Sequence, residues 1–259
     1  MEPSFRSHVK QLFGAAAIIV LATVLPASVA WSEDAKELLF ATDPTYPPFE
    51  FTKNGVLTGF DIDLVEAIAK AEGFKVKFEN VPFDGIIPAL KAGTYDAAVA
   101  AMVATEERAK SIDFSDPYFK TGLVIIVGSA DNTILGEKDL ADKRIAVEVG
   151  SVGAAKAAKV PGAQVSTFNG SPPTFIELSN GNVDAVIADG ASSNYAVATG
   201  AVKGVKILPD PLSTDDYAIG FPKDSENADL VNDGLKKVMA NGEYTRIYKQ
   251  WFGVEPPKN

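Results

Sequence analysis

Strand and helix signals alternate along this chain from Leu38 onward, and this alternation limits the folds open to it. Short runs of branched apolar residues are followed by longer stretches that carry apolar residues at helical spacing. A helix between two strands lets those strands lie parallel and covers a face of the sheet. We therefore predict an α/β protein with mainly parallel sheets and flanking helices.

The first series of elements occupies the N-terminal part of this pattern. In chain order it comprises a strand at 37–42, a helix at 61–72, a strand at 74–79, a helix at 82–91 and a buried strand at 94–102. A loop that contains three prolines separates the first strand from the first helix. Gly73 and Gly93 follow the two helices, where glycine commonly ends a helix.

A second series begins after Gly122. Its predicted strands lie at 123–127, at 145–149, near Val165, at 183–188 and at 217–221. Its predicted helices begin after Ser151, near Pro173 and near Gly190, and two terminal helices are separated by Asn241-Gly242. The two series predict two α/β lobes of similar size.

Residues 1–30 have the features of a secretory signal peptide. Arg6 and Lys10 form a positive start, 12–25 an apolar core, and 28–30 a small-residue cleavage site. The apolar core is shorter than the roughly 20 residues of a membrane span, although an uncleaved anchor remains the alternative. Removal of the first 30 of the 259 residues leaves 229, enough for one large domain or two modest ones.

The composition excludes several classes of site. The chain has no cysteine, and its one histidine, His8, lies in the predicted signal peptide. The mature protein therefore lacks disulfides, thiolate or imidazole metal sites and Ser-His-Asp chemistry, and we expect no metal and no cofactor. A net charge of −10 argues against nucleic acid and anionic lipid as partners. A soluble periplasmic protein of a Gram-negative cell fits best.

Arg108 follows the predicted strand at 94–102 and a capped turn. Thr105 can cap a short helix, and Glu106 and Glu107 suit the positive end of its dipole. A strand that ends at a helix N-terminus presents free N–H donors above the sheet. Arg108 is thus a candidate to hold a carboxylate there, and the alternative is a solvated arginine paired with one of the two glutamates.

Other candidate residues also lie at predicted strand ends, where open α/β sheets bind ligands. They are Asp43, Tyr46, Phe83, Glu148, Ser151 and Asp189. Ordinary explanations remain for each: Asp43 as a turn residue, the two aromatics as core residues and Asp189 as a helix start. So many polar and aromatic residues at successive strand ends favour one shared ligand site.

Several longer runs carry a family resemblance. They are ATDPTYPPFEF (41–51), GFDIDLVEAIAK (59–70), FDGIIPAL (83–90), YDAAVAAMVATEERAKSIDFSDPY (95–118), NVDAVIAD (182–189) and NGEYTRIYKQWFG (241–253). In these runs the chain resembles the periplasmic solute-binding proteins of polar amino-acid ABC transporters, close to the glutamine-binding and lysine/arginine/ornithine-binding members. The runs cover nearly the whole mature chain in order.

The resemblance implies the two-lobed type II periplasmic binding protein fold, with the ligand in the cleft between the lobes. Lobe 1 would comprise 31–119 and 217–259, and lobe 2 would comprise 120–216. Two crossover hinge strands, near 118–122 and 213–217, would join the lobes.

The resemblance also implies roles for individual residues. Arg108 would clamp the ligand α-carboxylate, and Asp189 would pair with its α-ammonium. Further positions around the ligand would be Tyr46, Phe83, Ala101, Met102, Val103 and Ser151. Arginine and an acid on opposite lobes are both satisfied only when the lobes close, so ligand binding would select the closed state.

Three positions bear on specificity. Val103 stands where the family usually has Ser or Thr, so the carboxylate would depend on Arg108 and on backbone N–H groups. Glu148 replaces a Gln, Lys or apolar residue of relatives, and with Asp43 nearby it favours a cationic or amide-bearing ligand side chain. An anionic ligand such as glutamate is disfavoured. The alternative is that Glu148 turns into solvent.

These observations predict a monomeric, non-enzymatic receptor that captures a free L-amino acid and delivers it to an inner-membrane ABC permease. The ligand would be polar or basic, such as arginine or glutamine. One alternative is a dehydratase-like enzyme on the same fold, with Glu148 as general acid. Another is a ligand-sensing partner of a membrane receptor.

Overall fold

The computed structural model describes residues 35–257, which belong to one compact unit at Glu33–Asn259. The predicted signal peptide, 1–30, lies outside the described residues. Within the described part, none of the helices combines the length and the apolar character that crossing a membrane requires.

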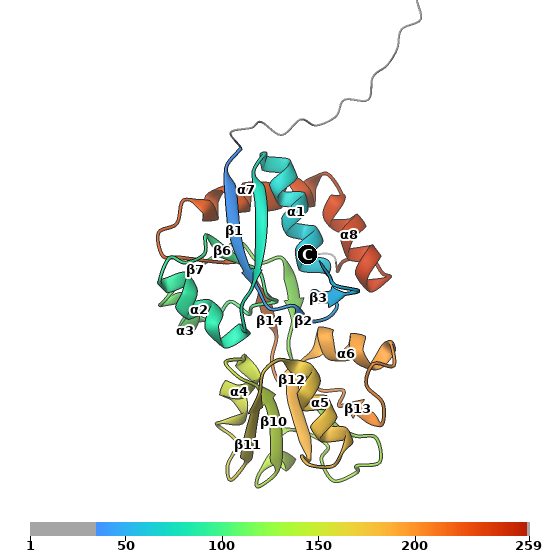
Figure 1. Cartoon of the computed structure of the whole chain (residues 1–259). Coiled ribbons are helices and arrows are strands. Elements are labelled where there is room, and N and C mark those ends of the chain that lie inside the picture. Colours follow the sequence, from blue (N-terminus) through green and yellow to red (C-terminus); the bar gives the residue numbers. More distant parts are fainter. Residues whose placement is uncertain (1–34, 258–259) are drawn as a thin grey trace, which may run out of the picture. The chain divides into compact units, whose positions relative to one another are not determined.

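The first lobe is built on a five-stranded sheet with helices on both faces (Figure 1). Its strands, in spatial order, are β5 (Lys75–Asn80), β1 (Glu37–Thr42), β6 (Ala97–Ala98), β15 (Gly220–Phe221) and β7 (Asp113–Phe114). Its helices are α1 (Phe60–Glu72), α2 (Phe83–Lys91), α7 (Asn227–Ala240) and α8 (Glu243–Phe252). Helices α1, α7 and α8 share one core cluster, whereas α2 packs in another with Ala41 and Ala98.

The second lobe repeats this plan with a second five-stranded sheet. Its strands, in spatial order, are β11 (Gln164–Phe168), β10 (Arg144–Glu148), β12 (Ala185–Asp189), β9 (Leu123–Gly128) and β13 (Val205–Ile207). Its helices are α4 (Val152–Ala157), α5 (Ser171–Ser179), α6 (Gly190–Ala198) and the 3-10 helix η1 (Glu137–Leu140). Residues of β9 alternate between two apolar clusters, one on each face of the sheet.

The strand pairing within each sheet is mixed. In the first sheet β1 pairs in parallel with β5 and β6, and β15 is antiparallel to β6 and β7. In the second sheet β10 pairs in parallel with β11 and β12, and β9 is antiparallel to β12 and β13. The parallel part of each sheet thus consists of strands that alternate with helices, as the sequence pattern predicts. The antiparallel part contains β15 and β9, which follow the crossover strands into the two lobes.

Two antiparallel strands connect the lobes. These strands, β8 (Phe119–Thr121) and β14 (Asp215–Tyr217), pair with each other, with Tyr217 opposite Phe119. Gly122 follows β8 at a close approach, where an added Cβ would lie 2.1 Å from the Ser213 carbonyl oxygen. Both crossover strands that the resemblance implies are therefore present.

Three predicted segments differ from the structure. The strand expected at 94–102 is reduced to β6, and beyond it Ala101 has φ 43 and gives its N–H to Asp61 rather than to a neighbouring strand. The strand expected at 217–221 divides between β14 and β15, which lie in different sheets. The proline-rich loop also contains an unpredicted three-stranded sheet: β2 (Thr45–Tyr46), β3 (Glu50–Lys53) and β4 (Val56–Thr58).

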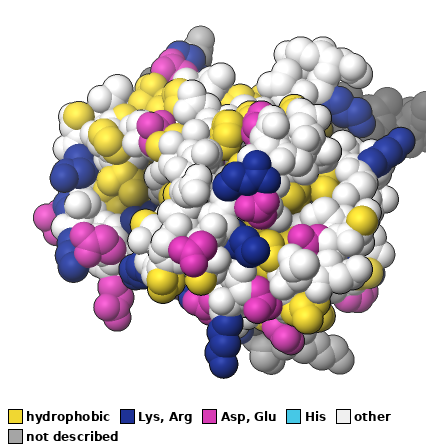
Figure 2. All heavy atoms as spheres, turned by 90° about the horizontal axis from the view of Figure 1, so that it is seen from below, with side chains coloured by type: hydrophobic (Ala, Val, Ile, Leu, Met, Phe, Trp, Pro, Cys, Tyr) yellow, Lys and Arg dark blue, Asp and Glu magenta, His cyan; other side chains and the backbone are white. Residues whose placement is uncertain are grey.

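The end of the molecule opposite the first sheet carries no single kind of side chain. Figure 2 shows acidic and basic side chains interspersed on that face, with only small apolar areas between them. Mixed charge of this kind keeps a surface soluble without creating a strong field of one sign.

Candidate ligand-binding site

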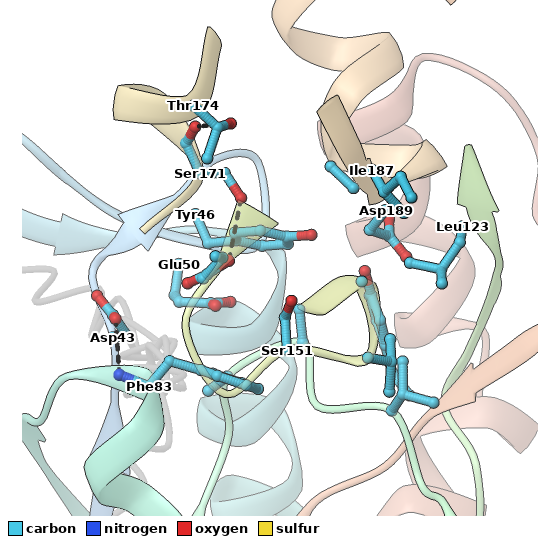
Figure 3. Close-up of a pocket in the computed structure, with 18 of the residues that line it drawn as sticks. Asp43, Tyr46, Glu50, Phe83, Leu123, Ser151, Ser171, Thr174, Ile187 and Asp189 are labelled. Atoms are coloured by element: carbon cyan, nitrogen blue, oxygen red, sulfur yellow. Dashed lines mark hydrogen bonds between the residues drawn. The ribbon is translucent and has the colours of Figure 1, made fainter. Parts of the chain in front are cut away.

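A cavity lies between the two lobes, and residues of both sheets line it. We call it the cleft cavity. It contains about 570 Å³ of space not filled by atoms, its mouth included. Figure 3 shows Tyr46, Glu50 and Phe83 on one side of it and Leu123, Ile187 and Asp189 on the other.

Nine of the ten candidate site residues line the cleft cavity. They are Asp43, Tyr46, Phe83, Ala101, Val103, Arg108, Glu148, Ser151 and Asp189. Met102 does not: it is fully buried in the core cluster that contains Ile86 and Leu90. Ala101 and Val103, by contrast, belong to the other core cluster of the first lobe and also line the cavity.

Strand ends bring the charged residues together. Asp43 directly follows β1, Glu148 is the last residue of β10, and Asp189 is the last residue of β12. These are carboxyl ends of parallel strands, and the two sheets present them to the same cavity. Phe83 joins them as the first residue of α2.

Arg108 is held by backbone groups of both lobes. It lies in the short helix α3 (Glu106–Ala109), whose N-cap Thr105 accepts a hydrogen bond from the Arg108 N–H at 3.2 Å. Its guanidinium donates to the carbonyl oxygens of Val103 at 2.8 Å and Gly150 at 3.1 Å. The guanidinium carbon lies 5.3 Å from the centre of the Phe83 ring, a cation–π distance.

Electrostatics keep this arginine charged. Burial lowers the pKa of Arg108 to about 10, and the nearby Glu148 and Asp215 carboxylates oppose that shift. The side chain is therefore a cation at neutral pH. The structure does not show the alternative of a solvated Arg108 paired with Glu107, because Glu107 forms its ion pair with Lys110 instead.

Asp189 is both a helix cap and a cavity residue. Its Oδ1 accepts hydrogen bonds from the N–H groups of Ala191 at 2.9 Å and Ser192 at 3.4 Å, at the start of α6. Its Oδ2 accepts from the Thr121 hydroxyl of crossover strand β8. Burial raises the pKa of Asp189 to about 6, so the carboxylate is mostly ionised at neutral pH.

Glu148 faces the cavity rather than solvent. Its Oε2 accepts a hydrogen bond from the Ser171 hydroxyl at 3.1 Å. Burial, with repulsion from Asp43, raises the pKa of Glu148 to about 7, while Arg108 partly offsets the shift. A cationic group that entered the cavity would therefore favour ionisation of Glu148.

Asp43 is the second acid near that end of the cavity. One oxygen accepts from the Phe83 N–H at 2.9 Å, and the other accepts from the Thr45 hydroxyl at 2.9 Å. Burial raises its pKa as well. These bonds fix both the carboxylate and the start of α2, which carries the Phe83 ring.

Direct contacts cross the cleft outside the cavity. Besides Arg108 and Gly150, the Ser192 hydroxyl of α6 donates to the Pro47 carbonyl of the first lobe at 2.8 Å. A Cβ added to Gly150 would lie 3.1 Å from that of Asp84 in α2. The two lobes thus touch around the rim of the cavity.

Sequence reasoning missed several lining residues. They include Glu50, Leu123, Ser171, Thr174 and Tyr217. Glu50 lies in the unpredicted β3, and Tyr217 belongs to a crossover strand. The Asn54-Gly55 turn, with φ 53 and 78, was the available signal for the hairpin that carries Glu50.

The lining is strongly acidic. Four carboxyl groups, those of Asp43, Glu50, Glu148 and Asp189, share the cavity with Arg108, which is the one cation among the described residues that line it. Within residues 35–257, no group of three or more His, Cys, Asp or Glu side chains could hold a metal ion. This charge balance favours a ligand with one anionic group and more than one cationic or hydrogen-bond-donating group.

A family model described as bacterial extracellular solute-binding proteins, family 3, matches residues 38–254. The chain belongs to this family. Among curated relatives of this solute-binding protein, the arginine-binding extracellular protein ArtP of Bacillus subtilis is 32% identical and aligns over 94% of this chain and 97% of its own. A probable histidine-binding protein of Neisseria gonorrhoeae is 33% identical over 83% and 82% of the two chains.

Solved structures agree with the family assignment. The arginine-, lysine-, histidine-binding protein ArtJ of Geobacillus stearothermophilus is similar with a TM-score of 0.82 and 36% identity, covering 85% of this chain and 97% of that one. An ancestral arginine-binding protein bound to arginine gives 0.80 and 42%, with coverage of 84% and 98%. The solute-binding protein therefore has the two-lobed type II periplasmic binding protein fold.

Proposed function

We propose that this solute-binding protein captures an L-amino acid with a cationic or amide-bearing side chain in the cleft cavity and delivers it to an inner-membrane ABC permease. The charge pattern of the cavity supports this proposal: it has one partly buried arginine, with Asp189 on the facing lobe and two further acids, Asp43 and Glu148, at other strand ends. An amino acid with a basic side chain is complementary to this pattern because it has one carboxylate and two cationic groups.

Arg108 is suited to the ligand carboxylate. A guanidinium has five N–H donors, and the carbonyls of Val103 and Gly150 use two of them. The remaining donors are free to bind a carboxylate, and such charge-assisted bonds contribute roughly 1.5–3 kcal/mol each. Val103 supplies no hydroxyl, so Arg108 and backbone N–H groups would carry the carboxylate.

Asp189 is suited to the ligand ammonium. Its carboxylate is oriented by α6 and Thr121, and its ionised form is available at neutral pH. Tyr46 and Phe83 would contact the aliphatic part of the ligand, and Ser151 would add a hydrogen bond from the second lobe. Asp43 and Glu148 would face the end of the ligand side chain.

The relatives support this class of ligand. Relatives whose names give a specificity include arginine-, histidine- and glutamine-binding proteins. The Glu148 and Asp43 pair favours arginine among these, because two acids are better matched by a guanidinium than by an amide. Export through the predicted signal peptide, a periplasmic location and action as a monomer complete the proposal.

Calorimetric titration of the mature protein with the twenty amino acids tests the proposal. We expect heat and a thermal shift with L-arginine or another polar amino acid, since a ligand at a hundredfold its Kd adds about 2.7 kcal/mol of stability. Arg108→Met should weaken binding by at least roughly 100-fold, because it removes the charge-assisted bonds but keeps an aliphatic stem.

A matched control is Lys110→Met, which removes an equal charge two residues away. Lys110 is exposed, and Glu107 is its one ion-pair partner within residues 35–257, so affinity should stay within about twofold of the wild-type value. Absence of heat with all twenty amino acids would overturn the proposal, and equal affinity in Arg108→Met would move the carboxylate site elsewhere.

One observation favours an enzyme as a second candidate. A solved ancestral amino-acid-binding protein described as a precursor of cyclohexadienyl dehydratase has a TM-score of 0.77 and 36% identity to this chain, over 83% and 95% of the two chains. Glu148, with a pKa of about 7, has the protonation behaviour of a general acid. Incubation with prephenate or arogenate separates the two functions: product that disappears in Glu148→Gln would favour the enzyme.

A further inference from the structure

Two acids, Glu50 and Asp61, are buried together beneath the cleft cavity. Glu50, in β3, is 1% exposed, and Asp61, in the first turn of α1, is 0% exposed. The backbone brings their elements into contact, because the Asp61 N–H donates to the Phe49 carbonyl at 2.9 Å. Glu50 also lines the cavity, so this pair lies next to the ligand site.

Of the two Asp61 carboxylate oxygens, only one has hydrogen-bond partners among the described residues. Oδ2 of Asp61 accepts from the Ala101 N–H at 2.9 Å and from the Tyr118 hydroxyl at 2.7 Å. Oδ1 of Asp61 and Oε2 of Glu50 are both buried, and neither has a hydrogen-bond partner among the described residues. Two carboxylates cannot satisfy each other, since an ionised carboxylate only accepts hydrogen bonds.

The groups around the pair offer little compensation. The ionisable groups that act on it are the acids Asp43 and Glu148 and the phenols of Tyr46, Tyr118 and Tyr244. Arg108, in the same cavity, directs its guanidinium to the carbonyls of Val103 and Gly150. Two full negative charges buried here would repel each other strongly.

We propose that Glu50 and Asp61 share one proton, with the Glu50 carboxyl donating to Oδ1 of Asp61, and that this acid pair positions the Ala101 segment of the ligand site. One proton supplies the missing donor for both buried oxygens and turns a repulsion into a charge-assisted hydrogen bond. The pKa values agree: burial and Asp61 raise that of Glu50 well above its ordinary value, and burial raises that of Asp61 to about 6.

The positioning role follows from the Ala101 backbone. Ala101 has φ 43, a left-handed conformation that residues with a Cβ rarely adopt unless the surroundings hold it. Its N–H bond to Asp61 does so. Ala101 lines the cavity, and two residues later the Val103 carbonyl accepts a hydrogen bond from the Arg108 guanidinium. The acid pair therefore orients the segment that supports the carboxylate clamp.

The shared proton is tested without a ligand by infrared spectroscopy of the protonated carboxylic acid C=O band. At pH 8.5, a chosen pH that is above the pKa of about 7 of Glu148 and about 6 of Asp189, those acids are mostly ionised. We expect the band in the wild-type protein and in Glu148→Gln, and its loss in Glu50→Gln. Absence of the band from the wild-type protein, or its persistence in Glu50→Gln, would overturn the proposal.

The positioning role is tested with two matched variants, and this arm rests on the proposed function. Glu50→Gln keeps an N–H donor toward Asp61, whereas Glu50→Met keeps a similar shape without a donor. We expect Glu50→Gln to bind L-arginine within about threefold of the wild-type protein, and Glu50→Met to bind at least roughly tenfold more weakly. Failure of Glu50→Met alone to fold would also support the need for the donor.

Equal affinity and stability of the two variants would contradict the positioning role. If the wild-type protein binds no amino acid, the proposed function fails by itself. The infrared band would still decide whether the proton is shared.

Discussion

The two sides of the cleft build their charged groups in different ways. In the first lobe, Arg108 lies on a four-residue helix after the distorted Ala101 segment, and buried side chains hold that segment. In the second lobe, Glu148 and Asp189 end regular strands, and Asp189 also caps a nine-residue helix.

The cores behind these groups differ as well. The first lobe places aromatic rings close to the crossover strands: Phe49 lies 4.9 Å from Phe119 and 5.1 Å from Tyr217, between ring centres. The second lobe has mainly aliphatic clusters on the two faces of its sheet, with Phe175 as a buried aromatic in one of them. Regular strand-to-helix turns therefore suffice for the second lobe, whereas the first lobe depends on side-chain networks. Substitutions should affect the two sides differently.

The largest effect is expected at Asp189, where the cap and the charge can be separated. Asp189→Asn keeps an oxygen for the N–H groups of α6, and Asp189→Ala removes it. Both should weaken L-arginine binding by at least roughly 100-fold, as loss of one partner of a buried charge pair does. Only Asp189→Ala should also lose about 1 kcal/mol of unfolding free energy through the missing cap.

Calorimetry and urea unfolding measure the two effects. If Asp189→Asn bound L-arginine as tightly as the wild-type protein does, the charge of Asp189 would not contribute to binding of the ligand ammonium.

A smaller, pH-dependent effect is expected at Glu148. Its pKa of about 7 means that it gains charge as the pH rises through neutrality, so affinity for L-arginine should increase between pH 6 and 8, a range chosen to bracket that value. The ligand-free protein should instead become less stable as the pH rises over this range. A pKa that is raised in the folded state stabilises the protein at pH values below the unfolded-state pKa, and this stabilisation is lost as the pH rises to the folded-state pKa.

Glu148→Gln should remove the pH dependence near and above pH 7, leaving the part near pH 6 that Asp189 causes, and should lower affinity for L-arginine by roughly tenfold at pH 8. Affinity for L-glutamine, which has no side-chain charge, should show only the weaker pH dependence that comes from Asp189, with its pKa of about 6, and should show it equally in both proteins. Binding of L-arginine that stays constant from pH 6 to 8 in the wild-type protein would exclude Glu148 as its partner.

The smallest effect is expected at Thr105, the cap of the helix that carries Arg108. Thr105→Ala removes the acceptor for the Arg108 N–H and should weaken L-arginine binding by about threefold to tenfold, the equivalent of about 1 kcal/mol. Thr199→Ala is the control, because among the described residues the Thr199 hydroxyl donates to two carbonyls near the end of α6, away from the cavity. Equal affinities for these two variants would mean that the Thr105 cap of α3 is not needed to position Arg108.

The sequence predicted regular parts of the molecule well and the special parts poorly. Apolar spacing and Gly73 predicted α1 to within one residue, because both signals are local. The apolar run at 94–102 suggested a long strand, but a distant side chain, that of Asp61, removes Ala101 from the sheet. No local pattern carries that information.

The site shows the same division. Asp43, Glu148 and Asp189 could be located because they end predicted strands. Glu50 and Tyr217 could not, because one lies in a hairpin hidden among prolines and the other reaches the cavity from a crossover strand. Met102 differs from its two neighbours for a reason that needs the backbone geometry: it packs in the core cluster of α2, whereas Ala101 and Val103 belong to the other cluster of the lobe and line the cavity.

The most direct test of the account compares L-arginine with agmatine, which lacks the carboxylate, on the wild-type protein and on Arg108→Met. The wild-type protein should prefer L-arginine by at least roughly 100-fold, and this preference should nearly vanish in Arg108→Met, because both changes remove the same interaction. A preference for L-arginine that persists undiminished in Arg108→Met would contradict the assignment of Arg108 as the carboxylate clamp.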